Sequence, residues 1–233
     1  MLFRSSINRS LFRTLRDEFD RYPNLHLDEP VALGQVGVID NAAGNFEWRT
    51  SLDTLGVKAP LLPGGPTPAI VNTAYTTGSN TRCDFTLDAA GLGAADFDFQ
   101  SQRSLATQAL GMRTERYDIG LLEAALNAHI QAGNTWNRDW VIVTQIHPAE
   151  AYTLLFSRST DVEARIATQV PVSSPAFNIA DPQLGLALTR SSGALYSVLA
   201  QADVVPYFRI HKLKGWRGAG EGQKLTLEPY GRG

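Results

Sequence analysis

The sequence predicts an α+β protein with mainly antiparallel strands and packed helices. Two segments place apolar residues at the spacing of an amphipathic helix, whereas most of the remaining chain alternates apolar and polar residues in short runs. The links between consecutive runs are short, which favours antiparallel pairing because a parallel crossover needs a dozen or more residues. With 233 residues, 43% of them hydrophobic, the chain can form a sizeable core in one large domain or two small ones.

Charge and cysteine content exclude several classes of protein. The formal net charge of −2 argues against a dedicated nucleic-acid binder, whose surface would be basic. The single cysteine, Cys83, excludes an intramolecular disulfide and a cysteine-based zinc site, and it favours a reducing compartment. No run approaches the roughly 18 apolar residues of a transmembrane helix, a test that membrane strands would escape.

The first predicted element is a basic amphipathic helix, RSSINRSLFRTLRDEF, at residues 4–19. Ser5 or Ser6 can cap its start, and the turn at 22–24 ends it because the residue before a proline avoids the helical region. One face is apolar and carries Ile7, Leu11, Phe12, Leu15 and Phe19. The other positions include Arg4, Arg9, Arg13 and Arg16, with no acidic residue among positions 1–16.

Three functions fit this helix. It resembles a mitochondrial transit peptide, it could be a structural helix with solvated arginines, or it could meet anionic lipid. A second basic cluster near the C-terminus, Arg209, Lys212, Lys214 and Arg217, favours the lipid interpretation. We therefore predict that both clusters contact anionic membrane lipids.

Strands are expected through most of the first half of the chain. Residues 31–39 and 46–52 form a predicted hairpin around a turn at 41–45, and the proline-rich stretch 60–69 is a loop. The next run places Cys83, Phe85 and Leu87 on one face. Because this face is apolar, we expect Cys83 to be a buried structural cysteine rather than a nucleophile.

A second helix precedes a β-rich last third. Asp118 is the expected N-cap of this helix, and Gly133 is expected to end it. We expect its apolar face to pack on the sheet. This face holds Ile119, Leu122, Leu126 and Ile130. The expected strands that follow are 139–146, a turn at 148–150, 152–159, 162–170, 184–189, 194–200 and 205–215. Residues 216–233 are rich in glycine and form a flexible tail with one apolar patch at Leu225–Leu227.

Catalytic and cofactor signatures are scarce. The chain lacks the glycine-rich nucleotide-binding motifs and the nucleophile elbow of α/β-hydrolases, so we expect neither an enzyme nor a cofactor. His147 and Glu150 have a metal-ligand spacing, but the intervening Pro148 favours a solvated hairpin tip. Asp96 and Asp98 share a strand face, where they could form an acid–base or cation-binding pair or a plain hydrophilic surface.

Four runs of the sequence resemble the bacterial gasdermins in order and spacing. These are VALGQVGVI at 31–39, FEWRTSL at 46–52, WNRDWVIVTQIHPAEAYTLLFSRSTDVEARI at 136–166 and VVPYFRIHKLKG at 204–215. The resemblance implies a twisted, mainly antiparallel sheet in a pore-forming domain, residues 1–215. A short autoinhibitory tail, residues 216–233, would be removed by a partner protease. Family members can carry an acylated cysteine near the N-terminus, whereas positions 2 to 4 here are Leu, Phe and Arg.

The resemblance also implies where and how the protein acts. The resting form is expected in the cytoplasm, and the cleaved form is expected to oligomerise in the inner membrane and kill a phage-infected cell. The expected cleavage region runs from Arg217 to Lys224, the tail would dock through Leu225 and Leu227, and residues 162–170 have the length of a membrane strand. The alternatives are a non-enzymatic α+β module recruited through its basic N-terminal helix and an uncharacterised hydrolase.

Overall fold

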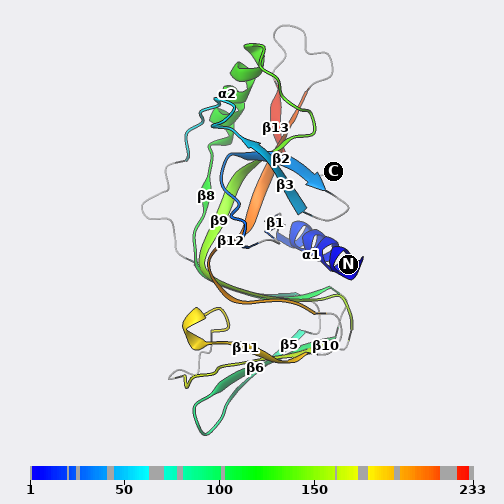
Figure 1. Ribbon diagram of the computed structural model, residues 1–233, viewed down its shortest axis with the longest axis vertical. Helices are drawn as coiled ribbons and strands as arrows, with labels where there is room; N and C mark the ends of the chain where they lie inside the picture. Colours follow the sequence, from blue (N-terminus) through cyan, green and yellow to red (C-terminus); the bar gives the residue numbers. More distant parts are fainter. Residues whose placement is uncertain are drawn as a thin grey trace. The chain divides into compact units, whose positions relative to one another are not determined.

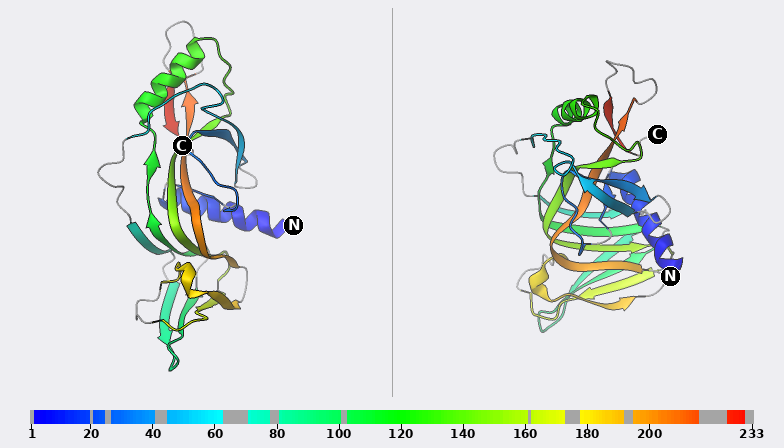
Figure 2. Two further views of the ribbon diagram at one scale, coloured as in Figure 1. Left: turned by 60° about the vertical axis from the view of Figure 1, so that its left-hand side comes forward. Right: turned by 45° about the horizontal axis from the view of Figure 1, so that its top comes forward.

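A computed structural model describes residues 2–19, 21–24, 27–40, 45–62, 71–77, 81–100, 103–160, 162–172, 178–191, 195–215 and 225–230. The chain divides into two compact units. The first unit comprises Met1–Ala69, Thr114–His147 and Val205–Gly233, and the second comprises Ile70–Arg113 and Pro148–Val204. The long strands β9 and β12 each contribute residues to both units and lie side by side (Figure 2).

The architecture is α+β, as predicted, and the strand pairings whose register is defined among the described residues are antiparallel (Figure 1). The helices are α1 (Leu2–Phe19), α2 (Ile119–Gln131) and the short 3₁₀ helix η1 (Pro182–Leu184). The strands are β1 (Tyr22–Pro23), β2 (Gln35–Asp40), β3 (Asn45–Ser51), β4 (Val71–Thr77), β5 (Thr81–Leu87), β6 (Gly93–Phe99), β7 (Ser104–Met112), β8 (Glu115–Arg116), β9 (Val141–Ser157), β10 (Val162–Ala167), β11 (Ala187–Ser191), β12 (Leu195–Lys214) and β13 (Thr226–Pro229).

The helix α1 buries the apolar face that its sequence predicts. Leu11, Phe12 and Leu15 are buried, and the ring of Phe12 packs 5.0 Å from that of Tyr22. The side chains of Ile7 and Phe19 lie outside the described residues. Two local details differ from the expectation. The helix begins at Leu2, so Ser5 and Ser6 lie inside it, and the predicted turn at 22–24 contains the short strand β1, which pairs with β12.

The helix α2 has the predicted ends and the predicted packing. Asp118 accepts a hydrogen bond from the backbone N–H of Leu121 (3.1 Å), and Gly133 follows the last turn with φ +83°. This left-handed backbone conformation favours glycine, because glycine has no Cβ that would clash with the backbone. The buried core around α2 contains Val36, Leu52, Val57, Leu122, Leu126, Trp136, Ile142, Leu213, Leu225 and Leu227, and Ile119 and Ile130 pack against it.

The short strands of the first unit pair with the two long strands β9 and β12. β12 pairs with β1 and β13, while β9 pairs with β2 and β8. The hairpin of β2 and β3 is confirmed, with Asp40 opposite Asn45 next to the expected turn. Most of the loop predicted at 60–69 lies outside the described residues, which resume at 71.

The second unit holds two groups of paired strands. β7 pairs with β4 and β9, and a separate four-stranded sheet has the order β11-β10-β6-β5. The sequence did not predict β4 and β7, because their apolar residues do not alternate regularly with polar ones. Their existence depends on the long partner β9, which supplies the backbone hydrogen bonds for β7.

The turn predicted at 148–150 is wrong, because the chain continues through it as one strand, β9. β9 passes through Pro148, whose carbonyl accepts a hydrogen bond from the N–H of Arg113 (2.8 Å), between the pairings with β8 and β7. A proline is tolerated at such a break in the ladder because no N–H is needed there. β12 likewise joins the segments predicted as 194–200 and 205–215, and it absorbs left-handed residues at Ala200 and Asp203.

Candidate functional site: an amphipathic sheet, basic surfaces and the C-terminal segment

The four-stranded sheet of the second unit has one apolar face and one charged face. Across β6 and β10 the apolar face contains the buried residues Ala95, Phe97, Phe99, Val162, Ala164 and Ile166. The rings of Phe97 and Phe99 stack with their centroids 6.1 Å apart. The alternation of β10 is confirmed, but this strand ends at Ala167. The N–H of Thr168 still donates to the carbonyl of Gly93 (2.9 Å), and the chain bends at residues 169–170. Residues 162–170 are therefore not one nine-residue strand.

The apolar face continues onto β5, where it is exposed. β5 is an edge strand, and Cys83 and Phe85 stand directly opposite Phe97 and Ala95 of β6. Phe85 is 47% exposed and Leu87 49%, and Cys83 is exposed as well. The prediction of a buried cysteine is wrong, because alternation identifies the apolar face of a strand and not whether another element covers it. Partial desolvation, Asp84 and Asp96 raise the pKa of the Cys83 thiol, which disfavours the reactive thiolate.

The opposite face of this sheet carries charges of both signs. It holds Arg82, Asp84, Asp96, Asp98, Glu163 and Arg165, which line or border a shallow pocket of about 230 Å³. Arg165 forms an ion pair with Asp96 (3.4 Å), and Arg82 forms one with Asp84 (3.5 Å). Asp98 accepts a hydrogen bond from Gln100 (2.6 Å). These contacts favour the plain hydrophilic surface over an acid–base pair, and no three His, Cys, Asp or Glu side chains in the described ranges are placed to hold a metal ion.

The arginines of α1 lie on the side of the helix away from its buried face. Arg9 and Arg13 are exposed, whereas Arg16 is half-buried and pairs with Asp17 (2.9 Å). The side chain of Arg4 lies outside the described residues. The exposed arginines therefore form a cationic surface on a helix whose apolar side is already used in the core, as a structural helix would be.

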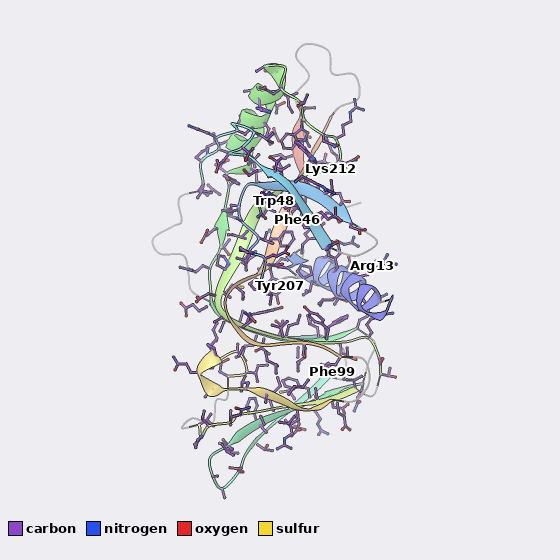
Figure 3. The ribbon with its side chains drawn as sticks, viewed as in Figure 1. Arg13, Phe46, Trp48, Phe99, Tyr207 and Lys212 are labelled. Atoms are coloured by element: carbon purple, nitrogen blue, oxygen red, sulfur yellow. The ribbon has the colours of Figure 1, made fainter. Side chains whose placement is uncertain are left out.

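The second basic cluster does not lie on one face. By strand alternation, Arg209 of β12 projects to the side opposite Lys212 and Lys214. Lys212 pairs with Asp139 (3.6 Å) and lies 6.0 Å from the centroid of the Tyr230 ring, and Lys214 pairs with Glu228. Figure 3 shows Arg13 and Lys212 well apart, so the two clusters are separate surfaces.

The C-terminal segment, residues 225–230, is docked on α2 and β12. Leu225 is 3% exposed and Leu227 7%, and both belong to the core around α2. Asn127 brackets Leu225 by accepting from its N–H and donating to its carbonyl, each over 2.8 Å, while Glu123 accepts from the N–H of Leu227 (3.0 Å). The role of Asn127 was not predicted, because the sequence around a polar helix residue does not indicate which distant residue it will contact. Arg217 and Lys224 lie outside the described residues.

His147 does not lie at a hairpin tip. It is 1% exposed within β9, while Glu150 is exposed. Gln145 Nε2 donates to Nε2 of His147 (2.9 Å), so Nδ1 carries the proton and donates to Thr114 Oγ1 (3.2 Å). Desolvation, assisted by Arg21 and Arg209, lowers the pKa of His147 to about 3. The two residues are an odd number of positions apart on one strand and face opposite sides, which contradicts a shared metal site.

Comparisons with known proteins differ between sequence and structure. No protein-family model matches the chain, and no curated protein matches its sequence. The structure is similar to a chain in a cryo-EM structure of the gasdermin A3 membrane pore, with a TM-score of 0.37 and 12% identity, over 99% of this chain and 95% of that chain. Within the described residues, no helix has both the length and the apolar character needed to span a membrane.

Proposed function

We propose that this protein is a non-enzymatic pore-forming effector. The observation that carries the proposal is the amphipathic sheet of the second unit, in which β5, β6 and β10 alternate apolar and charged residues and the apolar side of β5 is exposed at Phe85 and Leu87. Strands of a membrane pore show this same alternation, with one face toward lipid and the other toward water. The sequence resemblance to bacterial gasdermins supports the same function.

Insertion of these strands requires more than one copy of the chain. Open strand edges are not tolerated in the hydrocarbon region, so strands that enter it have to close into a ring, here a homo-oligomer. A membrane strand needs about 9 to 11 residues, whereas β5 and β6 have 7 each and β10 has 6. The proposal therefore requires these strands to lengthen on insertion.

The C-terminal segment is the proposed restraint on this change. Its two buried leucines contribute roughly 1.5 to 3 kcal/mol each, and its pairing with β12 and Asn127 adds polar contacts. A partner protease would cut between Arg217 and Lys224, after which the segment is held only by these contacts. A tethered segment at millimolar effective concentration then becomes a dilute peptide. The resting protein would be cytoplasmic, and the cleaved one would act at the inner membrane in anti-phage cell death.

Cleavage of the folded full chain tests the proposal. A recognition site for a specific protease is inserted between Arg217 and Lys224, and dye release is measured from liposomes containing anionic lipid. We expect leakage only after cleavage, and no leakage when the protease is inactive or the inserted site is scrambled. Intact liposomes after complete cleavage, with residues 1–215 still folded by circular dichroism, would contradict the pore function.

The rival function is a binding module recruited through α1. The observation that favours it is the exposure of Arg9 and Arg13 on a helix whose apolar face is buried, which leaves charge rather than apolar surface for a partner. The same experiment separates the two functions. A binding module would associate with anionic vesicles equally well before and after cleavage, without leakage.

A further inference from the structure

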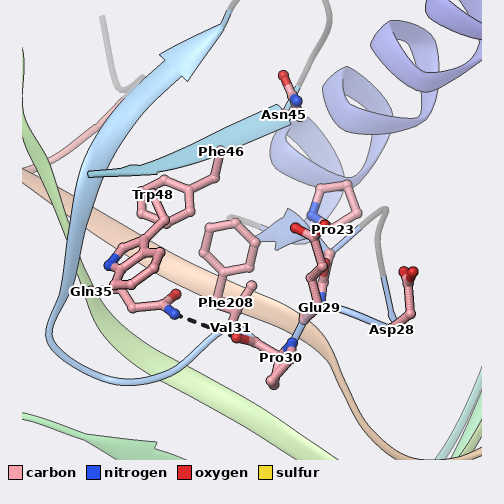
Figure 4. A pocket seen from close by; sticks show the side chains of 11 residues that line it. Pro23, Asp28, Glu29, Pro30, Val31, Gln35, Asn45, Phe46, Trp48 and Phe208 are labelled. Carbon is pink, nitrogen blue, oxygen red and sulfur yellow. Dashed lines mark hydrogen bonds between the residues drawn. The ribbon is translucent and has the colours of Figure 1, made fainter. Parts of the chain in front are cut away.

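A pocket of about 450 Å³ lies in the first unit between the chain leading to β2, the strand β3 and β12. This volume is within the range of small-molecule sites. Three aromatic side chains, Phe46, Trp48 and Phe208, line it together with Asp28 and Glu29. Figure 4 shows the aromatic rings gathered on one side of the pocket and the two acidic residues toward the other. None of these residues takes part in the proposed pore function.

The aromatic side of the pocket is held in place by its surroundings. The ring of Phe46 lies against Gly37. An added Cβ at Gly37 would come within 2.1 Å of the carbonyl oxygen of Glu47 and 2.8 Å of Phe46 Cε2, so only glycine allows this approach. Phe46 and Phe208 meet edge to face with centroids 5.8 Å apart, and Phe208 stacks on Tyr22. The indole N–H of Trp48 donates to the carbonyl of Thr50 (2.6 Å).

The acidic side of the pocket is tied to the same framework. Asn24 donates from its side chain to the carbonyl of Glu29 (3.1 Å), and its own N–H donates to the carbonyl of Pro206 (2.9 Å). Gln35 donates to the carbonyl of Pro30 (3.4 Å). Asp28 and Glu29 are exposed and have no ion-pair partner among the described residues. They can therefore accept a cation without breaking an existing pair.

We propose that this pocket binds an organic cation of the quaternary ammonium type. The face of an aromatic ring attracts a cation through its quadrupole, most strongly in tryptophan, and quaternary ammonium groups are bound in this way by aromatic cages. Trp48 is 62% exposed, which is unusual for so large a side chain and leaves its ring available to a ligand. Glu29 and Asp28 supply the opposite charge, and the methyl groups of the ligand fill the apolar side of the pocket.

Binding of choline and a neutral analogue to the full chain tests this assignment. The probe is choline, and the control is 3,3-dimethylbutan-1-ol, which has the same shape without the charge. Saturation-transfer NMR of the ligand methyl groups gives both affinities. We expect choline to bind at least about tenfold more tightly, as cation–π attraction and opposite charge require. Equal affinities, or no binding of choline at millimolar concentration, would overturn the proposal.

Variants of the pocket connect the binding to its residues. We expect Trp48→Leu to weaken choline binding about tenfold and Trp48→Phe to retain most of it, because the aromatic face is kept. Glu29→Gln should weaken binding several-fold, whereas Glu115→Gln, a change at an exposed glutamate that does not line the pocket, should not. Thermal melting checks that each variant is folded. Undiminished binding by folded Trp48→Leu would place the ligand elsewhere and refute the assignment.

A second experiment distinguishes a lipid headgroup from a small soluble molecule as the source of the cation. Cosedimentation of the full chain with vesicles of phosphatidylcholine, reduced by Glu29→Gln and by free choline, identifies a lipid headgroup. Binding of free choline without binding to these vesicles identifies a small soluble cation. Absence of choline binding refutes the site whatever the vesicles show, and this outcome is independent of the leakage experiment because the pocket is not part of the proposed pore-forming sheet.

Discussion

At the scale of the residue, His147 makes the stability of the protein depend on pH. Its pKa in the folded chain is lowered to about 3 by desolvation, with Arg21 and Arg209 adding repulsion, whereas in the unfolded chain the value returns toward 6.5. Between these values the unfolded state binds a proton that the folded state does not. The free energy of unfolding should therefore fall as pH falls below 6.5, by at most about 1.4 kcal/mol per pH unit.

Urea denaturation at pH 7 and pH 5 measures this effect. The variant His147→Gln keeps a hydrogen-bonding side chain without the titration, so it should lose less stability between the two pH values than the unaltered protein. Equal losses in both proteins would show that His147 does not titrate in this way. From the sequence alone we expected His147 to be exposed, because Pro148 predicted a turn next to it.

At the scale of the element, the C-terminal segment is expected to control activity through its two buried leucines. We predict that Leu225→Asp combined with Leu227→Asp makes the uncut chain leak dye from liposomes, because two carboxylates cannot be buried against α2 without a large desolvation cost. The matched control is Thr226→Asp, which lies between them on the exposed side of the same segment and should stay inactive. An inert double variant beside an active cleaved chain would show that the restraint lies elsewhere.

Among the properties of the secondary-structure elements, strand length was predicted least well from the sequence. Alternation correctly identified the buried faces of β6 and β10 and the hairpin of β2 and β3. It divided β9 and β12 into shorter strands because proline, and small or polar residues, locally resemble turns. In β9, pairing with β8 before Pro148 and with β7 after it keeps the chain extended through the break.

At the scale of the whole molecule, charge should govern association with membranes. We predict that replacing Arg4, Arg9, Arg13 and Arg16 by Glu abolishes cosedimentation with anionic vesicles, since each basic residue near such a surface contributes about 1 kcal/mol. Arg9→Glu with Arg13→Glu should account for much of the loss because both side chains are exposed.

The control for this prediction makes the same charge change elsewhere. Arg113→Glu with Arg158→Glu alters two exposed arginines of the second unit. If vesicle binding depends on the surface of α1 rather than on net charge, this control should bind nearly as well as the unaltered protein, and added salt should weaken both. Unchanged sedimentation of the α1 variant would refute the predicted role of the arginines.

Features that depend on near neighbours in the chain are predictable from the amino-acid sequence alone. The apolar face of α1, the caps and packing face of α2 and the alternation of most strands follow from periodicity and from residue types that satisfy helix ends. The separation of charged from apolar side chains on β6 and β10 follows in the same way. These features are local because the backbone repeats every two residues in a strand and every 3.6 in a helix.

Which element covers each apolar face becomes known only when the chain is folded. Cys83, Phe85 and Leu87 are exposed because β5 is an edge strand, and His147 is buried because other elements surround the middle of β9. The bracket of Asn127 around Leu225 joins residues 98 positions apart, and the aromatic pocket brings together residues from β3 and β12. The burial of a side chain and its hydrogen-bond partners depend on contacts between segments that are distant in the sequence. Local periodicity does not predict these contacts.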